Sequence, residues 1–100
     1  MPLTAESIAA EIKARIVAIA AEIKARIVAI AAELGDDASE LGPDEIIPAT
    51  GLIDSAGLLD LIAWYEKTYQ IPLTQAEINI DNLGTLARMA HFVLLKKGLV

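Results

Sequence analysis

The sequence contains the same eleven-residue segment twice in immediate succession. Residues 8–18 and residues 19–29 both read IAAEIKARIVA. Eleven residues at about 100° each complete three helical turns plus about 20°, so a second copy lengthens a helix by about 16 Å and nearly preserves its apolar face. Two identical copies indicate a recent or deliberate duplication, and their identity favours a deliberate insertion. Any fold for this chain must therefore accommodate an unusually long helix.

The repeat predicts one helix from about Ala5 to Leu34, about 45 Å long. Thr4 is its expected N-cap, and Gly35 is its expected end. Its large apolar residues follow a 4-4-3 spacing that forms one stripe: Ile8, Ile12, Ile16, Ile19, Ile23, Ile27, Ile30 and Leu34. Two i,i+4 ion pairs are expected on the flank of this stripe: Glu11–Arg15 and Glu22–Arg26.

The stripe is longer than a small domain can cover. A domain of a hundred residues has a radius of gyration of about 13 Å, so the remaining residues cannot bury all of it. The uncovered part then projects into solvent, pairs with another chain, or is removed by looping out one copy. Because eight large apolar residues are aligned, we expect two first helices to pair antiparallel in a homodimer. The competing expectation is a monomer in which one copy loops out.

The rest of the chain predicts three further helices and no strand, within one all-α domain that spans residues 1–100. Residues 35–53 predict a long loop, with Ile46, Ile47 and Leu52 as apolar anchors. The first of the three expected helices runs from Ser55 to about Thr68, and a capping box at Thr74–Glu77 opens a short second one. Asp81 or Asn82 starts the last helix, which runs from about Leu83 to Lys97 and is closed by Gly98.

The second and last of these later helices supply the expected core. Asp60 and Glu66 are expected to face outward, Trp64 to be a packing residue and His91 to lie at the surface. The core residues expected from the second helix are Leu58, Leu59, Leu61, Ile62 and Tyr65, and those from the last helix are Leu83, Leu86, Met89, Ala90, Phe92, Val93 and Leu94.

Ser55 begins a helix within an acidic stretch. From Ile27 to Glu66, inclusive, there are nine acidic residues and no Lys or Arg. No base stands beside the serine, and negative charge disfavours an alkoxide, so Ser55 is a poor nucleophile. A basic partner can read the acidic surroundings, which favours a serine that is modified and presented to other proteins.

Composition excludes several classes of function. The net charge of −6 argues against nucleic acids and anionic membranes as partners. There is no cysteine and only one histidine, so neither a metal site nor a catalytic constellation is expected, and we expect no enzyme activity. No transmembrane or secretory segment is visible, and the expected location is the cytoplasm.

The motif Gly51-x-x-Asp54-Ser55, followed downstream by the segment 81–86 (DNLGTL), resembles the acyl carrier protein family. The resemblance implies a four-helix bundle with an elongated first helix. It implies that Ser55 is esterified with phosphopantetheine. The alternative role of Ser55 is to cap the helix, and Asp54 is expected either to assist the modifying enzyme or to provide that cap. Asp60 and Glu66 are expected either to contact partners or to be solvated acids on the helix surface. The implied partners are a phosphopantetheinyl transferase and an acyl- or aminoacyl-adenylating ligase.

The form Asp54-Ser55-Ala56-Gly57 is more similar to stand-alone carriers of amino acids, such as D-alanyl carriers, than to fatty-acid carriers, which usually have Leu after the serine. The alternative function is a non-catalytic helical interaction or oligomerisation module built on a carrier scaffold. In that hypothesis the lengthened first helix is the functional element.

Overall fold

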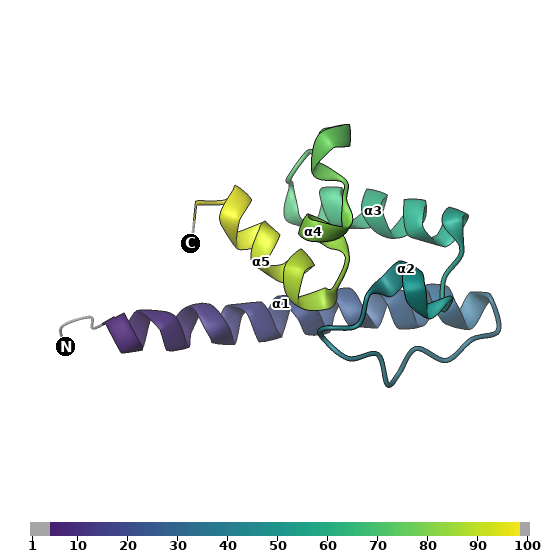
Figure 1. Cartoon of the computed structure of the whole chain (residues 1–100), viewed down its shortest axis with the longest axis horizontal. Helices are drawn as coiled ribbons and strands as arrows, with labels where there is room; N and C mark the ends of the chain where they lie inside the picture. The colour runs from purple at the N-terminus through teal and green to yellow at the C-terminus, as the bar shows by residue number, and fades with distance from the viewer. Residues whose placement is uncertain (1–4, 99–100) are drawn as a thin grey trace.

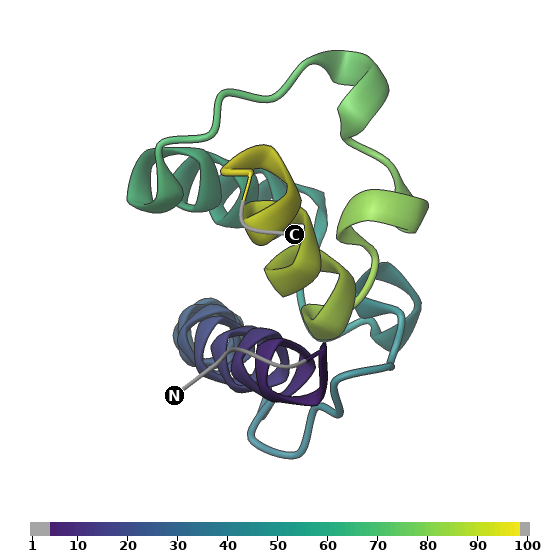
Figure 2. The same ribbon diagram turned by 90° about the vertical axis from the view of Figure 1, so that its left-hand side faces the viewer.

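The computed structural model describes residues 5–98, and these form helices and connecting loops without a strand (Figure 1). The elements are α1 (Ala5–Glu33), α2 (Ile47–Thr50), α3 (Ser55–Tyr69), the 3₁₀ turn η1 (Gln75–Glu77), α4 (Ile80–Leu83) and α5 (Leu86–Lys96). Helix α1 runs along one side of the molecule, and α3 and α5 both lie above it (Figure 2). The predicted all-α class and the elongated first helix are confirmed.

Helix α1 is continuous through both copies of the repeat, so the expectation that one copy loops out is wrong. The helix ends where predicted, because Gly35 adopts a left-handed φ of 84° that residues with a side chain rarely accept. The N–H of Asp36 then donates to the carbonyl of Ala31 over 2.8 Å. The predicted N-cap Thr4 lies outside the described residues.

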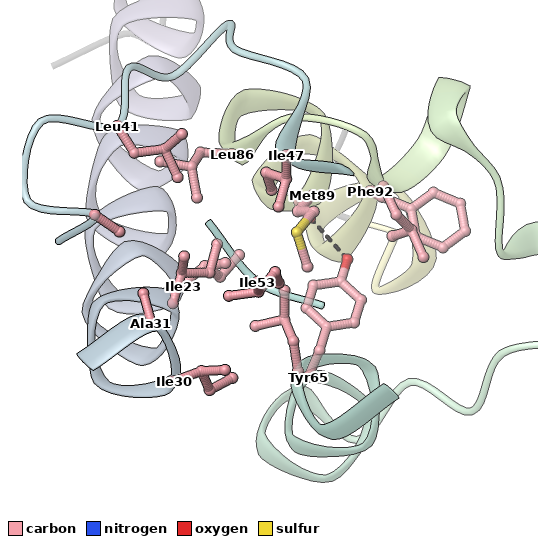
Figure 3. Close-up of a cluster of buried hydrophobic side chains, with 14 of the residues drawn as sticks. Ile23, Ile30, Ala31, Leu41, Ile47, Ile53, Tyr65, Leu86, Met89 and Phe92 are labelled. Atoms are coloured by element: carbon pink, nitrogen blue, oxygen red, sulfur yellow. Dashed lines mark hydrogen bonds between the residues drawn. The ribbon is translucent and has the colours of Figure 1, made fainter. Parts of the chain in front are cut away.

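The bundle uses the second copy of the repeat. Ile23 and Ile27 are fully buried and Ile30 is 4% exposed, whereas Ile8 in the first copy is 44% exposed. Figure 3 shows Ile23 and Ile30 in the space between α1 and the helices opposite. Across this core the hydroxyl of Tyr65 donates to the carbonyl of Met89 over 2.7 Å, which joins α3 to α5. One copy is therefore a core element, and the other extends beyond the bundle.

The loop after α1 is fixed at several points. Ala38 and Leu41 are buried, and the N–H of Ala87 donates to the carbonyl of Pro43 over 3.0 Å. The loop contains the short helix α2, which the sequence did not predict. Of the three predicted anchors, Ile47 is buried and Leu52 is partly buried, but Ile46 is exposed.

The predicted last helix is two helices. Asp81 and Asn82 belong to α4, which Asn79 caps by accepting the N–H of Asn82. Thr85 then caps α5 by accepting the N–H of Arg88 over 3.0 Å, so α5 begins at Leu86 rather than at Leu83. The predicted core residues of this region are all buried: Leu83, Leu86, Met89, Ala90, Phe92, Val93 and Leu94.

The capping box at Thr74–Glu77 is confirmed, although the helix that it opens is a single 3₁₀ turn. Lys96 of α5 pairs with Glu77 over 2.8 Å and thereby attaches this turn to the last helix. The bond from Lys96, together with the bond from the Thr74 backbone, holds the pKa of Glu77 below its ordinary value. His91 is exposed and Trp64 is half-buried against Tyr69, as predicted.

The repeat supplies a matched pair of core substitutions. Ile23→Ala is expected to lower the free energy of unfolding by about 2–5 kcal/mol, because it leaves a cavity at a fully buried position. Ile12→Ala, the same change in the same local sequence, is expected to cost about 1 kcal/mol or less, since Ile12 is only partly buried. Urea unfolding at low chain concentration measures both, and equal costs would contradict the assignment of the second copy to the core.

Candidate functional site

Ser55 is the first residue of α3, and its side chain is exposed. The residue before it provides the helix cap, since the Asp54 carboxylate accepts the N–H of Gly57 over 2.8 Å. The cap is thus assigned to Asp54, and Ser55 does not occupy the capping position. Within the first turn of a helix the N–H groups have no helical carbonyl to bond, so this end of α3 favours an anion.

Gly57 allows the start of α3 to approach α1. A side chain at this position would place its Cβ 3.0 Å from a methyl group of Ile30 and 3.3 Å from the Asp54 carboxylate. Glycine therefore lets the start of α3 rest directly on α1 at Ile30, one residue past the second copy of the repeat. The position of Ser55 is fixed by the core, while its hydroxyl remains in solvent.

The surroundings of Ser55 are acidic on the side of α1. A shallow hollow beside Ser55 lies between the end of α1 and the start of α3. Its lining includes three acidic side chains, Glu33, Asp54 and Asp60, and the apolar side chain of Leu34. Three acids of the predicted acidic stretch, Glu33, Asp54 and Asp60, therefore lie together beside the start of α3.

The two predicted partner-binding acids also have partners within the chain. Asp60 accepts from Arg26 of α1 over 3.2 Å, so the predicted pair Glu22–Arg26 is replaced by a pair between helices. Glu66 is half-buried and accepts the N–H of Leu73 over 3.1 Å, so it does not point simply outward. The other predicted pair, Glu11–Arg15, is confirmed at 3.7 Å.

An apolar pocket of about 160 Å³ lies between α2, α3 and α4. Leu58 and Ile62 of α3 line it from one side, and Ile78, Ile80 and Leu83 line it from the other. Leu58, Leu59 and Ile62 were predicted to face the core, but Leu58 and Ile62 are only partly buried and Leu59 is exposed. The sequence signal for the pocket was the presence of Ile78 and Ile80 in an otherwise polar segment.

The family model for the phosphopantetheine attachment site matches residues 25–93 of the chain. The chain belongs to this family. No curated protein and no solved structure matches it. Domains of the family carry a covalent phosphopantetheine group on a serine, so the chain is a phosphopantetheine carrier domain of the acyl carrier protein type. The match begins within the second copy of the repeat, which is the copy that the bundle buries.

The residues around Ser55 fit this group. An exposed hydroxyl is accessible to a modifying enzyme, and the free N–H groups of the first turn of α3 favour a phosphodiester. The Asp54 carboxylate is engaged as the cap and accepts the N–H of Gly57. Among residues 5–98 no cluster of acidic or histidine side chains could hold a metal ion, and in the same range no helix is long and apolar enough to cross a membrane.

The division of roles between Asp54 and Ser55 can be tested by stability. Asp54→Ala is expected to lower the free energy of unfolding by about 1 kcal/mol, because the α3 cap is lost. Ser55→Ala is expected to change it by less than about 0.5 kcal/mol, as at other exposed positions without a specific contact. Asp44→Ala, which removes the same charge from the exposed loop, is the control in urea unfolding. A larger loss for Ser55→Ala than for Asp54→Ala would return the cap to the serine.

Proposed function

We propose that Ser55 is the serine that bears the phosphopantetheine arm, and that the carrier presents an acyl or aminoacyl group to partner enzymes as a thioester on that arm. The observation that carries this proposal is the exposure of Ser55 at the start of α3, next to a residue that already caps the helix. The arm supplies a thiol at the end of a flexible linker, and the chain itself anchors that linker at a rigid point. Tethering raises the effective concentration of the cargo at each enzyme that docks.

The pocket beside α3 supports a small apolar cargo. Leu58 lies one turn after Ser55, so the pocket begins within a helical turn of the attachment point. The only side-chain amide in its lining belongs to Asn79, and both ends of that amide are engaged, by the N–H of Asn82 and by the carbonyl of Ala76. A free ammonium group finds no partner in this lining, because the rest of it is apolar or glycine. We therefore propose a short acyl group, or the aliphatic side chain of an amino acid, as the occupant.

The proposed partners are a phosphopantetheinyl transferase and an adenylating ligase, each docking through a basic surface. Exposed acids near Ser55, Asp54 and Asp60 among them, supply the negative field for such encounters. Arg26 reduces this field, since its guanidinium pairs with Asp60. A partner cation that docks on Asp60 therefore competes with Arg26 for the same carboxylate.

Intact mass spectrometry tests the attachment site. After treatment with coenzyme A and a transferase of broad specificity, the chain is expected to gain the mass of a single phosphopantetheine group. Ser55→Ala is expected to gain none, and Ser39→Ala, a serine exposed in the acidic loop, is expected to be modified like the unaltered chain. An adduct on Ser55→Ala would assign the arm to another residue.

Docking is expected to weaken with salt, because exposed charges are screened beyond about 8–10 Å at moderate ionic strength. Asp60→Asn is expected to raise the dissociation constant for the transferase by about 1.5- to 5-fold, the range for one exposed ion pair. Arg26→Ala is expected to lower it, since this change frees Asp60.

Arg15→Ala is the matched control, because it changes the net charge equally at the same position of the other copy. Titrations at low and high salt measure these constants. If Arg26→Ala and Arg15→Ala change the dissociation constant equally, Arg26 does not compete for Asp60. If the dissociation constant does not depend on salt, docking is not electrostatic.

A further inference from the structure

The first copy of the repeat carries an apolar surface that the bundle leaves largely uncovered. We call Ile8, Ile12 and Ile16 of the first copy, together with Ile19 at the start of the second, the free stripe; Ile19 also packs against the edge of the core. Ile8 is 44% exposed and the other three are partly buried. In Figure 1 this half of α1, in purple, extends beyond the bundle, and α5 is the helix that lies toward this end of α1.

A groove continues this surface onto α5. It lies between the free stripe, α4 and α5 and has a volume of about 450 Å³. Its lining combines apolar residues with polar ones: Ile16, Ala87, Phe92 and Leu95, and Asp81, Asn82, Arg88 and His91. Leu95 is itself 50% exposed. The uncovered area is thus a helix face with an adjoining wall, a shape that another helix can fill.

We propose that the partner of this surface is the same surface of a second chain, with the two α1 helices antiparallel about a two-fold axis. In this arrangement Ile8 lies opposite Ile19 of the other chain, and Ile12 lies opposite Ile16. The isoleucines of one helix therefore lie opposite isoleucines of the other when the two helices run antiparallel. Each chain offers the same set of apolar residues to its copy, which is the condition for a closed symmetric dimer.

The charges beside the stripe have the same symmetry. Glu11 and Arg15 precede Ile12 and Ile16 and so lie on one flank, where they pair over 3.7 Å. Two antiparallel helices related by a two-fold axis bring their like flanks together, so Glu11 of each chain lies near Arg15 of the other. The first copy carries two basic residues and one acidic residue, whereas the whole chain has a net charge of −6. Two acidic domains thus meet where their mutual repulsion is smallest.

The proposed contact is short and leaves the carrier site free. Residues 8–19 span about 18 Å of helix, less than a permanent dimer interface usually requires, so we expect association in the micromolar range. The start of α3 rests on Ile30, which is about 27 Å along α1 from Ile12. The two Ser55 residues then lie at the outer ends of the dimer.

Deletion of one copy is the main test. Removal of residues 8–18 or of residues 19–29 yields the same sequence, and the copy that remains is the one that the bundle buries. By analytical ultracentrifugation, the full chain is expected to shift from the mass of one chain to that of two across the micromolar range. The deletion variant is expected to remain monomeric, with circular dichroism verifying its fold. If both remain monomeric, or both associate equally, the proposal is wrong.

Charge exchange tests the antiparallel register without shortening the chain. Glu11→Lys is expected to weaken association, and Glu11→Lys combined with Arg15→Glu is expected to restore it, because the exchanged flanks are again complementary. Ile12→Asp is expected to weaken it by about tenfold, as for one interface anchor. Leu59→Asp is the control, since Leu59 is an exposed leucine on α3 outside this surface.

If the double variant associates no more tightly than Glu11→Lys, the antiparallel register is wrong. If Leu59→Asp weakens association as much as Ile12→Asp does, the contact is not at the free stripe. Flotation with neutral phosphatidylcholine vesicles tests the other occupant. A monomeric chain that floats with the vesicles would assign the free stripe to a lipid surface instead.

Discussion

The structure depends on the burial of the second repeat copy beneath α3 and α5. Ile23 and Ile27 lose all contact with solvent there, and Ile30 lies directly under Gly57 at the start of α3. The same contact therefore closes the core and fixes the start of α3, where Ser55 lies two residues before Gly57. An arm on Ser55, the residue proposed to carry it, would have its base beside this contact.

Much of the fold was predictable because its signals are local. The helical periodicity of α1, the Thr74–Glu77 capping box and the buried residues of α5 each depend on neighbours within one or two turns. The position of Ser55 at a helix start was predictable for the same reason. The division of roles with Asp54 was not, since both residues have side chains that can cap a helix, and only the Gly57 N–H distinguishes them.

The remaining features depend on tertiary contacts that a sequence pattern does not contain. Arg26 has the same local sequence as Arg15, yet it leaves the expected helix pair for Asp60 of α3. Glu66 is turned toward Leu73 by the path of the chain after α3. The apolar residues from Leu83 onward predicted one continuous helix. The helix instead breaks before α5, because the Thr85 side chain caps a new helix by accepting the N–H of Arg88. Which copy is buried was unpredictable in principle from the repeat alone, since the two copies are identical.

That identity gives α1 a second, slipped register. If the bundle moved one repeat toward the N-terminus, about 16 Å with about 20° of rotation, an identical set of isoleucines would enter the core and Arg15 would face Asp60. The helix itself provides no preference between the two registers. The preference comes from residues that occur once, above all Ala38 and Leu41, which are buried in the loop that returns from the end of α1. The specificity of this helical core therefore resides in a loop, and the length and anchoring of that loop select one of two equivalent folds.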